Sequence, residues 1–177
     1  MLIRTNNSLR EALYSVYVAI FNARNIHPDG FRDNDVTRLL TALMGSKPWS
    51  WRVVGITKEA LRLFQQNNFK RPPKLIQRGH KINRVETARR LFHCPKPVEP
   101  GEFFSIYLKN DETVLMTAEQ NRQKEFPEYI PINNPNAELF PSGSLIGWQH
   151  RQAEIDFLRE LVASEVAPFD WTVFPIS

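Results

Sequence analysis

One histidine lies in the middle of the most basic stretch of the chain, and it has the clearest chemical potential. Residues 70–90 read KRPPKLIQRGHKINRVETARR; they hold eight of the 23 Lys and Arg residues, and their only acid is Glu86. A neutral imidazole can accept a proton from water, so His80 is a candidate general base for hydrolysis. The alternative, usual for a lone histidine, is that His80 only hydrogen-bonds a backbone carbonyl or contacts a phosphate.

The basic residues around this histidine are candidates for holding phosphates. Nucleic-acid-binding proteins place Lys and Arg where they neutralise the charge of the backbone. The helix expected to begin at Asn83 adds free N–H groups at its first turn. A charged, solvated face that binds nothing is the alternative interpretation. The candidate nucleic-acid-binding residues are Lys70, Arg71, Lys74, Arg78, Lys81, Arg84, Arg89 and Arg90.

Arg78-Gly79-His80 resembles the core of the Asp-Arg-Gly-His motif of the ββα-metal nucleases, which are relatives of the HNH endonucleases. Gln77 stands at the position of the family's aspartate. In that family the histidine activates water, and a downstream asparagine helps to hold one divalent metal ion. The resemblance therefore implies His80 and Asn121 as catalytic residues, with Asn121 also a ligand of Mg²⁺ or Mn²⁺. An HNH-type arrangement would add His150 as a metal ligand.

Two other acidic patterns are weaker candidates for metal chemistry. Pro28-Asp29 supplies the first part of a PD-(D/E)xK nuclease motif, but neither Asp-x-Lys nor Glu-x-Lys occurs in the sequence. Asp33 and Asp35 could bind a cation, although helix capping explains them more simply. The chain has no P-loop and no Gly-x-Gly-x-x-Gly, so nucleotide cofactors are not indicated.

Aromatic side chains beside the basic segment could stack on exposed bases. The candidates are Trp49, Trp51 and Phe69, and burial in the core is the alternative that their size favours. Three aromatic residues near the C-terminus are instead candidates for a protein interface: Phe169, Trp171 and Phe174.

Hydrophobic periodicity predicts the elements that position these residues. Helices are expected over 8–24, after Asp33, after Thr57, after Asn83 and over 148–163, with Glu154 on the solvent face of the last helix. Strands are expected over 49–56 and 113–117, with shorter ones at 75–78 and 129–132. Residues 103–108 are ambiguous between helix and strand. We therefore expect one globular domain, 1–177, of the α+β class, with a small mixed or antiparallel sheet and four to five helices.

The overall composition narrows the class of protein. The formal net charge of +4 indicates a slight preference for anionic partners. A single cysteine, Cys94, excludes a disulfide within the chain and fits a reducing compartment. No apolar run approaches the roughly 20 residues of a membrane span. We expect a cytoplasmic protein that has no membrane partner.

These features together predict a DNA-binding protein that is a metal-dependent endonuclease hydrolysing phosphodiester bonds. Nucleic acid is the expected partner, DNA rather than RNA. Two alternatives stay open. One is a nucleic-acid-binding protein that is not an enzyme, and the other is a protein-interaction module whose basic face meets an acidic partner.

Overall fold

The computed structural model describes residues 3, 5–45, 47, 49–71, 74–143 and 147–166 of the chain. The α-helices are α1 (Asn7–Ile26), α2 (Asp33–Met44), α3 (Lys58–Gln66), α4 (Arg84–Phe92), α5 (Pro100–Asn110) and α6 (Gln152–Val166). The strands are β1 (Arg52–Ile56), β2 (Ile76–His80), β3 (Glu112–Thr117) and β4 (Ile130–Pro131), and two 3₁₀ turns are η1 (Pro28–Gly30) and η2 (Gln120–Arg122). None of the helices in these ranges is both long and apolar enough to cross a membrane.

The strands form one mixed sheet in the order β2-β3-β1-β4. β1 runs parallel to β3, whereas β2 and β4 pair antiparallel to their neighbours. The expected α+β class is confirmed. The described residues contain six α-helices rather than four to five, because the ambiguous segment 103–108 belongs to α5. Pro100 lies in the first turn of α5, where its missing N–H costs nothing.

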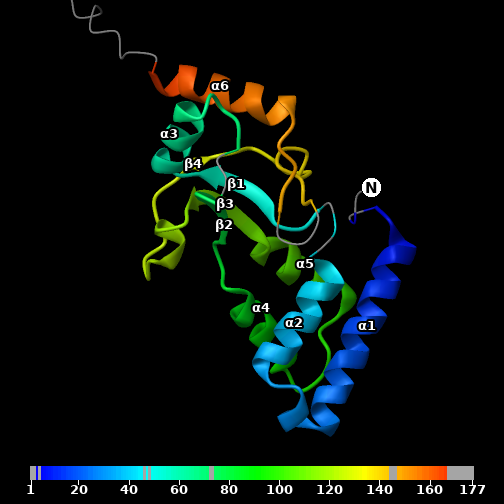
Figure 1. Cartoon of the computed structure of the whole chain (residues 1–177). Coiled ribbons are helices and arrows are strands. Elements are labelled where there is room, and N and C mark those ends of the chain that lie inside the picture. Colours follow the sequence, from blue (N-terminus) through cyan, green and yellow to red (C-terminus); the bar gives the residue numbers. More distant parts are fainter. Residues whose placement is uncertain are drawn as a thin grey trace, which may run out of the picture.

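A helical half is built from α1, α2, α4 and α5, which lie together at one end of the molecule (Figure 1). Leu13, Tyr17 and Phe21, four residues apart, form the buried stripe of α1. The ring of Tyr17 stacks on that of Phe103 with centroids 4.5 Å apart. Its hydroxyl donates to Leu91 O at 2.8 Å, and burial raises the pKa of Tyr17 to about 12.

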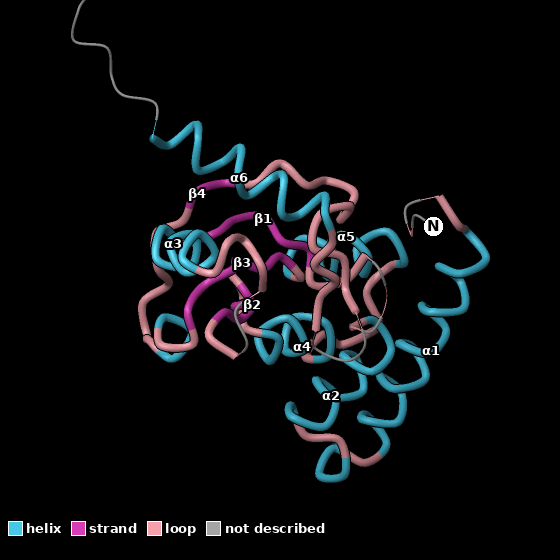
Figure 2. Tube along the Cα trace, turned by 45° about the horizontal axis from the view of Figure 1, so that its top comes forward, coloured by secondary structure: helices cyan, strands magenta, loops and turns pink. Residues whose placement is uncertain are grey.

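A sheet half occupies the other end, where α3 and α6 cover one face of the sheet (Figure 2). Val53 and Leu115 from the strands pack there with Phe64 of α3 and Leu158 of α6. Side chains alternate between the faces of a strand. A register shift between Val53 and Gly55 places Gly55 opposite Val114, on the other face from Leu115. That face meets the segment 118–129, since a Cβ added at Gly55 would clash with the ring of Tyr129 at 2.2 Å.

Glu154 is placed differently from the sequence-based expectation that it faces solvent. Its side chain is fully buried in the first turn of α6. The carboxylate accepts from Phe140 N at 3.0 Å and Arg151 N at 2.6 Å, and the Arg151 guanidinium donates to it at 2.7 Å. These bonds hold the pKa of Glu154 below its usual value although burial alone would raise it.

The C-terminal aromatic residues predicted as an interface lie outside the described residues. They are Phe169, Trp171 and Phe174.

Candidate nucleic-acid interface

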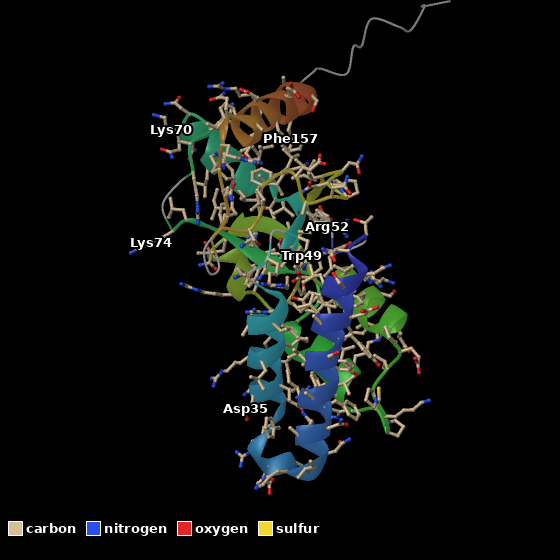
Figure 3. All side chains as sticks on the ribbon, turned by 90° about the vertical axis from the view of Figure 1, so that its right-hand side faces the viewer. Asp35, Trp49, Arg52, Lys70, Lys74 and Phe157 are labelled. Atoms are coloured by element: carbon tan, nitrogen blue, oxygen red, sulfur yellow. The ribbon has the colours of Figure 1, made fainter. Side chains whose placement is uncertain are left out.

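The basic segment 70–90 passes through three structural settings: a loop before β2, the strand itself, and the turn into α4. In the loop, Lys70 and Lys74 are exposed and form no ion pair with any described residue. Figure 3 shows both side chains on the same side of the sheet half, far from Asp35 at the end of the helical half. Residues 67–75 contain no acid, so no neighbour in this segment neutralises Lys70 or Lys74.

Arg78, by contrast, is a buried residue of β2 and is only 6% exposed. Its guanidinium donates to Trp51 O at 3.3 Å, Ser142 Oγ at 3.2 Å and Gly147 O at 2.7 Å. Burial lowers the pKa of Arg78 to about 10, and the charge of Asp111 partly opposes that shift. Arg78 therefore stays cationic at neutral pH and acts as a structural centre, turned away from phosphates.

The guanidinium groups of Arg71 and Arg84 lie over tryptophan rings. The Arg71 Cζ atom lies 3.7 Å from the centroid of Trp148, and its Nη1 donates to Trp148 O at 3.2 Å. The Arg84 Cζ atom lies 4.6 Å from the centroid of Trp51, and its Nη1 donates to Thr41 Oγ1 at 3.2 Å. Both contacts are cation–π interactions that fix the guanidinium in place.

The other predicted contacts of this segment divide between paired and free charges. Lys81 bonds Glu112 at 3.0 Å, and this bond raises the pKa of Lys81. Arg89 bonds Asp33 at 2.6 Å. The Arg90 side chain is exposed on the last turn of α4 and has no ion-pair partner among the described residues. Of the eight predicted residues, Lys70, Lys74 and Arg90 are therefore exposed without a bound partner.

His80 ends β2 with its imidazole against an acid and a tryptophan. Its Nε2 lies 3.3 Å from Asp111 Oδ1, and its ring meets that of Trp51 edge-on with centroids 4.4 Å apart. Asp111 is 5% exposed, and its other oxygen accepts from Trp51 N at 2.8 Å. The carboxylate thus fixes the imidazole orientation. Sequence reasoning missed this pair, because Asp111 lies 31 residues away and its local pattern predicts a turn.

Asn121, in η2, lies against the strand that carries the Arg-Gly-His motif. Its Nδ2 donates to Gln77 Oε1 at 2.8 Å. A Cβ added at Gly79 would lie 2.7 Å from Asn121 Oδ1, so the glycine permits this approach. Gln77 and Gly79 share one face of β2, whereas His80 shares the other face with Arg78. The Asn121 amide and the His80 imidazole are therefore on opposite sides of the strand.

His150 is packed between aromatic residues on the α3 side of the sheet. Its ring stacks on that of Phe64, with centroids 5.3 Å apart and planes 2° from parallel. Its Nε2 lies 2.8 Å from Phe69 O, to which it donates. Asn121 lies on the opposite face, so the two metal ligands implied by the resemblance are not brought together. The described ranges contain no group of three or more His, Cys, Asp or Glu side chains that could hold a metal ion.

The acidic residues of the helical half have local partners. Asp35 accepts from Arg32 N at 3.1 Å and so caps α2. Asp33 lies in the first turn of the same helix, and its carboxylate bonds Arg89 at 2.6 Å, His93 at 2.8 Å and Arg24 at 3.0 Å. Capping thus accounts for Asp35, as the sequence indicated, and ion pairs occupy Asp33.

A groove of about 530 Å³ opens beside the end of β2. One wall is His80, the following turn and the first turn of α4; the other is Met116 with the segment 120–127. Phe126, 42% exposed, lies at its rim and meets Tyr129 edge-on at 6.1 Å. Sequence reasoning missed this aromatic residue. Its one signal is its isolation within the polar stretch QNRQKEFPEY.

The aromatic residues that the sequence offered for base stacking occupy other places. Trp51 is 7% exposed and lies between Arg78, His80 and Arg84. Trp49 packs against the core of the helical half, and Phe69 packs against that of the sheet half. Phe126 is therefore the large aromatic side chain that the groove itself presents.

No protein-family model matches this chain, and comparison with curated proteins and with solved structures finds no match. The likeness to the ββα-metal nucleases accordingly rests on Arg78-Gly79-His80 alone.

Proposed function

We propose that this chain is a nucleic-acid-binding protein that contacts its ligand at both ends of β2. The observation that carries this proposal is the loop 67–75, where Lys70 and Lys74 are exposed, unpaired among the described residues and free of any neighbouring acid in the sequence. Unpaired cations on an exposed loop neutralise phosphates and release counterions. The groove at the other end of β2 adds a second contact region.

The spacing of these two regions suits an extended ligand. β2 has five residues, which at about 3.3 Å per residue span roughly 16 Å. A sugar–phosphate backbone that lies along β2 reaches from the loop to the groove over a few nucleotides. Arg71 in the loop and Arg78 in β2 contact the protein's own tryptophans and support the surface from within.

A double lysine variant tests the proposal. Lys70→Ala/Lys74→Ala should weaken binding of a labelled oligonucleotide in fluorescence anisotropy by about tenfold at moderate salt. Because two phosphate contacts are removed, the slope of log K against log salt should fall in magnitude by about 1.4 for a single strand or 1.8 for a duplex. Lys96→Ala/Lys109→Ala is the matched control, since both of these lysines are exposed in the helical half. Equal losses in the two double variants would contradict the proposal.

A metal-dependent endonuclease is the second candidate function, and one observation favours it: Asp111 orients His80 at one end of the groove. A positioned carboxylate–imidazole pair is a common arrangement for a general base. His80 would then take the proton of an attacking water, and a bound Mg²⁺ or Mn²⁺ ion would stabilise charge on the phosphate.

Supercoiled plasmid incubated with and without Mg²⁺ or Mn²⁺ distinguishes the two functions. Nicking that needs the metal and is lost in His80→Ala supports the endonuclease. Retardation of intact plasmid by both proteins supports binding alone. Absence of both nicking and retardation excludes both functions and leaves the interaction module with an acidic protein partner.

A further inference from the structure

The groove beside β2 is lined by charges of both signs: Lys81, Arg84 and Lys124 are basic, and Glu86 and Glu125 are acidic. Lys81 bonds Glu112 at 3.0 Å, and Arg84 lies over Trp51. Glu86 and Glu125 line the same groove and form no ion pair with any described residue. Lys124 also has no ion-pair partner among the described residues, but these two unpaired carboxylates offset its charge, so the groove is not a concentrated cationic site. The charge pattern therefore fits a neutral, hydrogen-bonding group better than a phosphate.

Several amide groups in the groove have unused hydrogen-bonding capacity. The Asn83 Oδ1 atom caps α4 by accepting from Val85 N at 3.0 Å, but its Nδ2 donates to no described residue. The Asn121 Oδ1 atom accepts no hydrogen bond within the described ranges, and the Gln123 side chain is equally free there. Amides present a donor and an acceptor together, which matches the edge of a nucleobase.

Phe126 adds an apolar surface at the rim of this groove. Its ring is 42% exposed and is in contact with Tyr129 in a perpendicular arrangement, with an angle of 90° between the rings. Such a contact leaves at least one face of Phe126 uncovered. An uncovered aromatic face beside free amides is the arrangement that holds a stacked base. The volume of about 530 Å³ is within the range of sites for small organic groups.

From these contacts we infer that the groove receives an unpaired nucleobase, stacked on Phe126 and hydrogen-bonded by the amides of Asn83, Asn121 and Gln123. The chain therefore binds single-stranded nucleic acid in preference to duplex. This inference rests on the proposed function, in which Lys70 and Lys74 hold the phosphates. A base within a duplex is stacked and paired, and its extrusion costs a few kcal/mol, which accounts for the preference.

The test compares one oligonucleotide sequence as a single strand and as a duplex, with the full chain at a fixed salt concentration. Phe126→Ala should weaken single-strand binding about 5- to 150-fold, which corresponds to the loss of one stacked base. Duplex binding should change less than twofold, because it depends on the lysines. Phe126→Trp should restore single-strand binding. Ile26→Ala, which truncates an apolar residue 84% exposed in the helical half, is the matched control.

The outcomes separate the inference from the function on which it rests. Equal affinity for single strand and duplex, with no effect of Phe126→Ala, overturns the inference and leaves nucleic-acid binding intact. Binding of neither form overturns the proposed function. Full competition by a free mononucleotide overturns the single-strand assignment and makes the groove a small-molecule site. Circular dichroism of each variant checks that the fold is retained.

Discussion

Asp33 in the helical half and Arg78 in the sheet half each form the centre of a cluster of polar contacts. Asp33 is an acid surrounded by Arg24, Arg89 and His93, and the Arg89 side chain is 61% exposed. Among the described residues, Arg78 is a base that contacts two tryptophan rings and donates to three neutral acceptors. The first cluster is open to water and salt, whereas the second is closed to both.

The difference shows that one basic segment performs two separate tasks. Residues 70–90 supply both Arg78 and Arg89, yet the first organises the interior and the second pairs on the surface. Exposed ion pairs contribute little to stability and are screened by salt. Removal of a buried cation lowers the free energy of unfolding strongly when the buried groups that it bonded are left unsatisfied. Under the proposed function, ligand binding depends on the cations that neither cluster uses.

Of the substitutions in the two clusters, Arg78→Met should lower the stability of the protein most. The substitution keeps much of the side-chain volume but removes the guanidinium's hydrogen bonds to Trp51 O, Ser142 Oγ and Gly147 O and its contacts with two tryptophan rings. We expect the free energy of unfolding to fall by about 3 kcal/mol or more. Urea denaturation followed by circular dichroism measures this loss. A loss below about 1 kcal/mol would show that the Arg78 cluster is not a structural centre.

The same acid-to-amide change can be made in both halves, at Asp111 beside Arg78 and at Asp33 in the centre of the other cluster. Asp111→Asn removes a charge next to Arg78 and weakens the bonds to Trp51 N and His80. We expect a loss of about 1.5 kcal/mol in the free energy of unfolding. Because the site is 5% exposed, the loss should persist in 1 M salt. Denaturation at low and at high salt is the measurement, and strong salt dependence would contradict the burial.

Asp33→Asn should cost less, about 0.5–1 kcal/mol, and the cost should shrink in high salt. The bond from Arg89, followed by those from His93 and Arg24, holds the pKa of Asp33 well below its ordinary 3.8. A lowered pKa in the folded state stabilises the protein above pH 3.8, and this contribution is lost as the pH falls further. The difference between the variant and the natural chain should therefore be largest near neutral pH and disappear in acid.

Arg90→Met is the matched control for Arg78→Met, and its effect should be the smallest. Arg90 is exposed on α4 with no ion-pair partner among the described residues. We expect a change within about 0.5 kcal/mol in the free energy of unfolding. A larger loss of stability would mean that the exposure of Arg90 and the burial of Arg78 do not explain why the two variants differ.

The local sequence pattern was sufficient to predict most of the helices and strands. Leu13, Tyr17 and Phe21 repeat at helical spacing, and the expected 8–24 became α1 with an end two residues further at Ile26. The start moved as well, because Asn6 caps the helix by accepting from Leu9 N at 3.0 Å. The helix α5 was ambiguous because residues 103–108, which read FFSIYL, are rich in aromatic residues and include Ile106. Aromatic and β-branched residues also favour strands.

The candidate site was predictable only in part. The basic character of 70–90 follows from the sequence, because it is a property of residues that are neighbours in the chain. The pairing of His80 with Asp111, the contact of Asn121 with Gln77 and the groove that Phe126 borders do not. Each of these joins residues from separate elements, which no local pattern specifies.

The sequence by itself determined where the helices and strands form and where the positive charge is concentrated, because both depend on residues that are neighbours in the chain. The tertiary structure alone decided which charges are buried. Arg78 became an interior residue because Trp51, Ser142 and Gly147 offer it acceptors, and Glu154 was buried because Phe140 and Arg151 donate to it. A charged group can leave water only where such partners surround it, and chain folding brings them together from distant positions.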